Sequence, residues 1–142
     1  MPTSQSRSVL VVEDETLVAM AAEDALRDEG FHVCGTAATE AAALRLAAEH
    51  APDFAVVDLD LGRGGSGLTV GRALAAGGVQ VLYATGNAPS WRQEMEDSGA
   101  RACLAKPFAP AALPRALAVL EDLHRPGAAP RPLPPELHLF VD

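Results

Sequence analysis

The sequence predicts an α/β fold, a doubly wound, five-stranded parallel sheet with helices on both faces. Two observations lead to this prediction. Five short runs of mostly apolar residues alternate along the chain with segments whose apolar residues recur at helical spacing. These runs carry almost no polar side chains, as expected of parallel strands that are covered on both faces. Right-handed crossovers between such strands limit the architecture to a doubly wound sheet.

The first strand–helix unit occupies residues 8–30. Residues 8–12 (SVLVV) form an apolar, β-branched run that predicts a buried strand. Apolar residues then recur at helical spacing through residues 18–26, and Gly30 offers the left-handed conformation that commonly ends a helix. Residues 31–35 begin the next unit with a second predicted strand.

The second and third units follow the same pattern. Thr39 can cap a helix that runs to His50. The third strand is predicted at residues 53–58. A glycine-rich stretch follows at residues 62–67; it lacks the residues of a phosphate loop and is predicted to be a flexible connection. A helix over residues 68–76 completes this unit.

Two further units complete the predicted sheet. Residues 79–84 form the fourth strand, and Pro89 is well placed as the first residue of a helix that ends at Gly99. The fifth strand is residues 101–104, and Pro110 opens the last helix. One face of that helix carries Leu113, Leu117, Leu120 and His124. We expect the flavodoxin-like strand order 2-1-3-4-5.

The chain is long enough for one folded domain and too short for two. We divide it into a flexible N-terminus at residues 1–7, the folded domain at 8–124 and a proline-rich C-terminal tail at 125–142. Because the prolines of the tail exclude a regular helix, we expect it to be disordered or loosely packed. The alternative is a short edge strand made by apolar residues near its end: Leu137, Leu139, Phe140 and Val141.

Composition and charge exclude some classes of function. The net charge of −8 at pH 7 argues against a surface that binds nucleic acid, since phosphate contacts need clustered Lys and Arg. No apolar run is long enough to span a bilayer, and the polar start of the chain is unlike an export signal. We therefore expect a cytoplasmic protein without membrane contact. Cys34 and Cys103 lie in apolar runs and are expected to be reduced thiols.

Polar side chains follow four of the five predicted strands. Glu13 and Asp14 come after the first, Asp58 ends the third, Thr85 follows the fourth and Lys106 follows the fifth. Because the carboxyl ends of parallel strands meet at one edge of the sheet, we expect these side chains to converge there.

The residue types at this edge predict phosphoryl chemistry. Three carboxylates gathered together need a cation, and Mg²⁺ suits them because it prefers oxygen ligands. The metal and the Lys106 ammonium would neutralise charge on a transferring phosphoryl group, while Thr85 donates a hydrogen bond to one of its oxygens. Asp58 would then be the nucleophile and would form an aspartyl phosphate.

This arrangement resembles the response-regulator receiver domains of two-component signalling systems, over residues 8 to about 124. The resemblance implies that Asp58 accepts a phosphoryl group from a histidine kinase or phosphotransfer protein. It also implies that Mg²⁺ is bound by Asp14, Asp58 and the backbone carbonyl of Asp60, with Glu13 acting through a water. The family signals by conformational change and is not enzymatic beyond self-phosphorylation and slow autodephosphorylation.

Further roles follow from the same resemblance. Lys106 and Thr85 would contact the phosphoryl group, and the bond between Lys106 and Pro107 is often cis in this family. The segment Tyr83-Ala84-Thr85-Gly86-Asn87 resembles a subgroup of single-domain receivers that are named for a Phe-Ala-Thr-Gly motif. We also expect a stand-alone receiver without an output domain, with an unknown downstream protein as partner and a homodimer as one option.

One position departs from the family. Three residues before the lysine, where receivers usually carry Tyr or Phe, this chain has Cys103. Because a thiol is too small to report a rotation at the surface, we expect the signal to pass through the turn at Thr85-Gly86-Asn87 and the helix that follows.

Two other functions stay open at this point. Asp58-Leu59-Asp60 matches the Asp-x-Asp motif of haloacid-dehalogenase-like phosphatases, with Asp60 as the general acid. Those enzymes place Asp-x-Asp near the start of the chain and a further acidic pair late. Because Glu13-Asp14 comes first here, the order of the motifs argues against a phosphatase of this type. The second alternative is a pseudo-receiver that binds partners and is never phosphorylated. This alternative stays open because Cys103 departs from the residue that receivers usually carry at this position.

Overall fold

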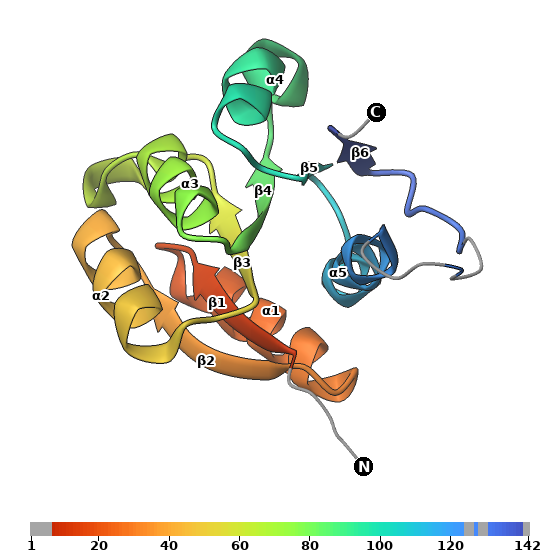
Figure 1. Ribbon diagram of the computed structural model, residues 1–142, viewed down its shortest axis with the longest axis horizontal. Coiled ribbons are helices and arrows are strands. Elements are labelled where there is room, and N and C mark those ends of the chain that lie inside the picture. Colours follow the sequence, from red (N-terminus) through yellow and green to blue (C-terminus); the bar gives the residue numbers. More distant parts are fainter. Residues whose placement is uncertain (1–6, 124–126, 128–130, 141–142) are drawn as a thin grey trace.

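The computed structural model describes residues 7–123, 127 and 131–140. They form a six-stranded sheet of order β2-β1-β3-β4-β5-β6 with helices on both faces (Figure 1). The first five strands are parallel, so the predicted doubly wound sheet and its order 2-1-3-4-5 are confirmed. The sixth strand is antiparallel and is an addition to the predicted sheet. The expectations for residues 1–6, His124 and Val141 lie outside the described residues.

The parallel strands carry mainly Val, Leu and Ala, which pack well between two layers of helices. β1 and β3 are inner strands of the sheet and are buried almost completely. The strands are β1 (Ser8–Val12), β2 (His32–Ala37), β3 (Phe54–Asp58), β4 (Gln80–Thr85), β5 (Ala102–Ala105) and β6 (Leu137–Leu139).

Five α-helices and one short 3-10 helix connect the strands. Thr39 caps the second α-helix as predicted, because its hydroxyl accepts a hydrogen bond from the Ala42 N–H at 3.1 Å. Pro110 precedes the last helix rather than opening it, and its carbonyl accepts a bond from the Leu113 N–H. The helices are α1 (Thr16–Asp28), α2 (Glu40–His50), η1 (Gly62–Gly64), α3 (Gly67–Ala76), α4 (Ala88–Asp97) and α5 (Ala112–Leu123).

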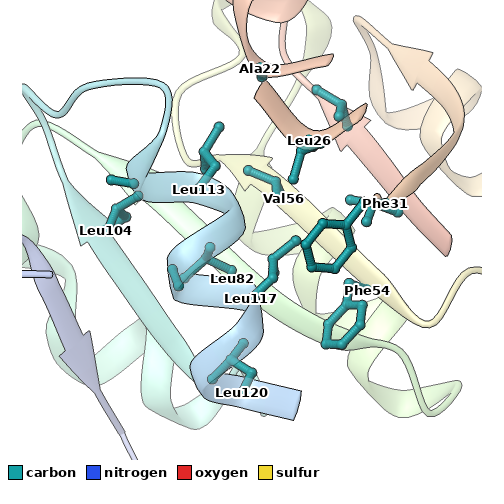
Figure 2. Close-up of a cluster of buried hydrophobic side chains, with 14 of the residues drawn as sticks. Ala22, Leu26, Phe31, Phe54, Val56, Leu82, Leu104, Leu113, Leu117 and Leu120 are labelled. Carbon is teal, nitrogen blue, oxygen red and sulfur yellow. The ribbon is translucent and has the colours of Figure 1, made fainter. Parts of the chain in front are cut away.

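The two faces of the sheet have different cores. α1 and α5 cover one face, and α2, α3 and α4 cover the other (Figure 1). The α1–α5 side holds leucines and the aromatic pair Phe31 and Phe54, whose rings meet edge to face 6.2 Å apart (Figure 2). The opposite side is filled mainly by smaller residues around the buried ring of Tyr83.

The C-terminal segment differs from the expectation of disorder or loose packing. Residues 137–139 form β6, which pairs antiparallel with β5 and lies beside it in Figure 1. The Phe140 N–H donates to the Arg101 carbonyl and the Ala105 N–H donates to the Glu136 carbonyl, both at 2.9 Å. The structure therefore shows the alternative expectation, a short edge strand made by the apolar residues near the end of the segment. This strand can form because the prolines stop at residue 135, which leaves an apolar run free to pair with an open sheet edge.

The start of the chain also contributes to the fold. Arg7, which the sequence analysis placed in the flexible N-terminus, pairs with Glu121 at 2.9 Å. Its guanidinium lies 3.8 Å from the ring centroid of Phe31, and its carbonyl accepts a bond from the His32 N–H. The first described residue therefore packs against α5 and the start of β2.

Candidate functional site

The side chains that were predicted to converge do meet at one edge of the sheet. Asp58 and Thr85 are the last residues of β3 and β4, and Glu13 and Lys106 directly follow β1 and β5. Glu13, Asp58 and Thr85 are each no more than 7% exposed, which is unusual for polar residues and marks a built site. Parallel pairing places these strand ends side by side, as the register of Asp58 with Ala84 illustrates.

Three carboxylates form the centre of the site. One carboxylate oxygen from each of Glu13, Asp14 and Asp58 lies within 4.8 Å of the other two. Glu13 and Asp58 are buried, whereas Asp14 is exposed at the rim. Like charges this close repel one another, and a divalent cation with oxygen ligands would relieve the repulsion. The acidic cluster therefore fits Mg²⁺.

The protonation of Glu13 depends mainly on its burial and secondarily on its charged neighbours. Burial raises the pKa of Glu13 to about 7, and the negative charge of Asp58 adds to the rise. A hydrogen bond from the Glu15 N–H at 3.1 Å and the positive charge of Lys106 act in the opposite direction. Without a cation, this carboxyl therefore holds its proton at a higher pH than an ordinary glutamate does.

Lys106 supplies the positive charge of the site. Its ammonium lies 3.4 Å from Asp58 Oδ1, which also accepts a hydrogen bond from the Asp60 N–H at 3.0 Å. The Lys106 N–H donates to the Thr85 carbonyl at 2.8 Å, so β4 stays paired up to the site. The bond between Lys106 and Pro107 is cis, as expected.

Thr85 connects the site to α4. Its hydroxyl oxygen accepts a hydrogen bond from the Asn87 N–H at 3.1 Å, and Asn87 directly precedes α4. A rotation of this hydroxyl would therefore free the backbone at the start of the helix.

Comparison with known protein families assigns the chain to a family. Residues 9–118 match the response regulator receiver domain. The chain belongs to that family. The matched residues include the acidic cluster, Thr85 and Lys106.

Similar proteins agree with this assignment. The receiver is 34% identical over 105 residues to the transcriptional regulatory protein PdtaR of Mycobacterium tuberculosis, covering 72% of this chain and 50% of PdtaR. It is 32% identical over 113 residues to the phyllosphere-induced regulator PhyR of Methylorubrum extorquens, covering 78% of this chain and 42% of PhyR. The chain thus spans about half the length of these relatives.

Solved structures show the same architecture. The receiver domain of PhyR from Erythrobacter litoralis superposes with a TM-score of 0.71 at 26% identity, covering 87% of this chain and 96% of that one. A response regulator from Burkholderia pseudomallei, solved with a phosphorylated aspartic acid, a calcium ion and citrate, gives a TM-score of 0.67 at 27% identity, covering 85% and 76%.

Asp60 is placed differently from the other acidic residues of the receiver. Its carboxylate accepts a bond from the Gly62 N–H at 3.0 Å and is not part of the acidic cluster found among the described residues. A phosphatase of the haloacid-dehalogenase type would need this carboxylate beside Asp58 as a general acid. Its position in the turn favours the receiver over that alternative.

The glycine-rich connection has a role that the sequence analysis missed. Residues 62–64 form η1, so this part of the connection is regular rather than the expected flexible link. A Cβ on Gly67 would overlap the backbone carbonyl of Asp58 and the backbone of Leu59. Gly67 therefore lets α3 start directly against the strand end that carries Asp58. The only signal in the sequence was the glycine itself.

Cys103 is buried and chemically quiet. Burial raises the pKa of its thiol to about 11, so it stays protonated at neutral pH. It points to the α4 side of the sheet, where it belongs to the same core as Tyr83. As expected for a small residue, it acts as a core filler.

A cavity of about 480 Å³ opens beside the acidic cluster. It is lined by Asp58 and Lys106 and by apolar residues, including Leu17 and Val18 of α1. These two side chains are 79% and 43% exposed. The approach to Asp58 is therefore bordered by an apolar surface of α1.

No helix in the described part of the chain is long and apolar enough to cross a bilayer.

Proposed function

We propose that this receiver takes a phosphoryl group from a histidine kinase or phosphotransfer protein onto Asp58 and signals by a change of conformation. The observation that carries the proposal is the placement of the buried Asp58 carboxylate. It lies within 4.8 Å of the acidic oxygens of Glu13 and Asp14 and 3.4 Å from the Lys106 ammonium. A carboxylate held between a cation site and a fixed ammonium suits phosphoryl transfer.

Each residue has a defined part in the transfer. A carboxylate oxygen of Asp58 attacks the phosphorus, the new O–P bond forms, and the bond to the donor nitrogen breaks. Lys106 balances charge on the phosphoryl oxygens. Mg²⁺ held by Asp14, Asp58 and the Asp60 carbonyl, with Glu13 acting through a water, would neutralise the remaining charge.

Thr85 converts the new group into a change of structure. Phosphorylation adds about one negative charge and three acceptor oxygens at Asp58. The Thr85 hydroxyl turns to donate to one of these oxygens and gives up the bond that it accepts from the Asn87 N–H. The turn before α4 is then drawn toward Asp58.

The phosphodonor docks over α1. A histidine of the donor must reach Asp58 through the cavity that Leu17 and Val18 border. Because both side chains are exposed and apolar, a donor with an apolar helical surface would bury them during transfer. Met20, which is 52% exposed on the same helix, extends this surface.

Labelling with a small phosphodonor tests the proposed function. Wild-type protein, incubated with acetyl phosphate and Mg²⁺, should gain one phosphoryl group by mass spectrometry, and Asp58→Asn should gain none. Asp60→Asn is the matched control and should still be labelled, since its carboxylate lies outside the cluster. Labelling of Asp58→Asn at the wild-type level would overturn the assignment of the nucleophile. An unlabelled wild type would support the pseudo-receiver alternative.

Metal binding is tested by thermal unfolding. Mg²⁺ binds the folded state only, so at 100 times its Kd it should add about 2.7 kcal/mol to the free energy of unfolding. Asp14→Ala should lose most of this gain, whereas Asp24→Ala, the same change at an exposed site on α1, should keep it. Equal stabilisation of both variants would place the metal elsewhere.

The pH dependence of this effect follows from Glu13. A raised carboxyl pKa stabilises the metal-free fold below the ordinary value of 4.5, and this stability is lost as the pH rises through about 7. Because Mg²⁺ favours the ionised carboxyl, the stabilisation by Mg²⁺ should be larger at high pH than at low pH. Glu13→Gln should flatten both trends in parallel unfolding experiments.

A further inference from the structure

The C-terminal strand β6 covers the outer edge of β5. It lies next to α4, whose preceding residue Asn87 donates a hydrogen bond to Thr85. It is only three residues long, and its pairing brings His138 opposite Cys103. Backbone bonds flank this pair, from the Phe140 N–H to the Arg101 carbonyl and from the Ala105 N–H to the Glu136 carbonyl. A strand this short has little stability of its own, so it depends on its other contacts.

A cavity of about 470 Å³ lies between β6 and α4. Its lining includes Gly86, Arg92, Cys103, Lys106, His138 and Phe140. Cys103 lines this space from β5. Among the residues that line it, Phe140 carries the only aromatic ring besides the imidazole of His138, so the bulk on this side of β5 comes from the C-terminal segment.

Arg92 joins α4 to this segment. Its guanidinium lies 5.3 Å from the ring centroid of Phe140 and donates to the Leu139 carbonyl at 3.4 Å. A second bond, to Glu96 at 2.7 Å, fixes the guanidinium on its own helix. Both contacts to the C-terminal segment are long, so a small displacement of α4 would break them.

The opposite end of α4 is held in place. The Tyr83 hydroxyl and the Ser98 hydroxyl are hydrogen bonded at 2.8 Å, and Ser98 also donates to the Met95 carbonyl at 2.7 Å. These buried contacts fix the C-terminal end of the helix. A pull on Asn87 therefore moves the N-terminal end of the helix, and Arg92 lies in the first half of it.

The order of the strands gives the direction of this movement. Asp58 ends β3, whereas β6 lies on the other side of β4 and β5. When Thr85 and Asn87 are drawn toward Asp58, the N-terminal half of α4 moves away from β6. The contacts of Arg92 with Leu139 and Phe140 are then lost.

We infer that β6 is a strap that Arg92 holds on the α4–β5 face and that phosphorylation of Asp58 releases. This inference rests on the proposed function for its trigger, but the hold by Arg92 does not depend on it. Release exposes the backbone edge of β5 together with the cavity that contains Cys103. Receivers usually carry an aromatic residue on β5 where this chain has Cys103. In this chain the C-terminal segment takes part in the switch in its place.

Amide hydrogen exchange with and without beryllofluoride and Mg²⁺ tests the strap. The amides of Phe140 and Ala105 should exchange about tenfold faster or more when beryllofluoride occupies the site, while the amide of Val57 in the central strand should not change. A bound signal in the fluorine NMR spectrum reports occupancy. A bound signal with unchanged exchange at Phe140 and Ala105 overturns the strap.

Two variants test separately the contact of Arg92 with the C-terminal segment and its release by way of Thr85. Arg92→Ala should speed the exchange of Phe140 without beryllofluoride, whereas Gln93→Ala, whose side chain bonds Asp97 on the same helix, should not. Thr85→Ala should show bound fluoride but slow exchange at Phe140. If no beryllofluoride binds to the wild type, the proposed function fails, but Arg92→Ala still tests whether Arg92 holds β6. Unchanged exchange of Phe140 in Arg92→Ala overturns the claim that Arg92 holds β6.

Discussion

The two helices on either side of β5 in the sequence are held to the sheet in different ways. α5 buries eight residues, and Leu113, Leu117 and Leu120 are among those in the core with the sheet and α1. α4 is nearly as long but buries one residue within its helix, Met95. Burial of apolar surface supplies most of the free energy that holds a helix in place. α5 is therefore part of the core, while α4 is attached at a few points.

α4 is attached to the rest of the domain by hydrogen bonds near its two ends. At one end a buried hydrogen bond joins Tyr83 to Ser98, and at the other end the Asn87 N–H bonds to Thr85. The side chain of Asn87 makes no capping bond, so the start of the helix relies on the bond from the Asn87 N–H to the hydroxyl of Thr85. Helices with few buried contacts move at low cost in free energy. Beside β5, the receiver thus has one helix held by many buried residues and one held by few contacts.

The largest effect that tests this comparison is expected in α5. Leu117→Ala should lower the free energy of unfolding by about 2–5 kcal/mol, because a fully buried leucine is replaced by a cavity. Trp91→Ala in α4 should cost less than about 1 kcal/mol, since the indole is 40% exposed. Urea unfolding measures both. A loss at Trp91 as large as that at Leu117 would contradict the weak attachment of α4.

A smaller effect is expected where α3 packs against the ring that anchors α4. A Cβ on Gly71 would overlap the hydroxyl and ring of Tyr83, which is fully buried and bonded to Ser98. Gly71→Ala should therefore destabilise the fold by about 1–3 kcal/mol. Gly86→Ala, where the added methyl meets open space, should change the free energy of unfolding by less than about 0.5 kcal/mol. Equal unfolding midpoints for the two variants would mean that the ring moves aside freely.

The smallest effect is expected from the anchor itself. Tyr83→Phe removes one buried hydrogen bond to Ser98 and should cost about 1 kcal/mol. Amide exchange should rise at the C-terminal end of α4, around Glu96 and Asp97, and stay unchanged in α5. If exchange rises equally in both helices, the anchor serves the whole fold and not α4 alone. Thermal unfolding with exchange detected by NMR measures both quantities.

The sequence alone determined the five parallel strands, their order and the edge at which the polar residues meet. Each strand is a local apolar run, and the carboxyl ends of parallel strands must lie at the same edge of the sheet. Glu13, Asp58, Thr85 and Lys106 could therefore be placed together without coordinates. The cap at Thr39 was equally local, since it involves residues three positions apart.

Only the tertiary structure decided the features that depend on distant segments. β6 forms because an open edge of β5 is available to residues 137–139, and no local pattern outweighed the prolines before them. The contacts of Gly67 with Asp58 and of Gly71 with Tyr83, like the raised pKa of Glu13, arise from groups that only packing brings together. Periodicity records which face of an element is buried, but it does not record what lies against that face.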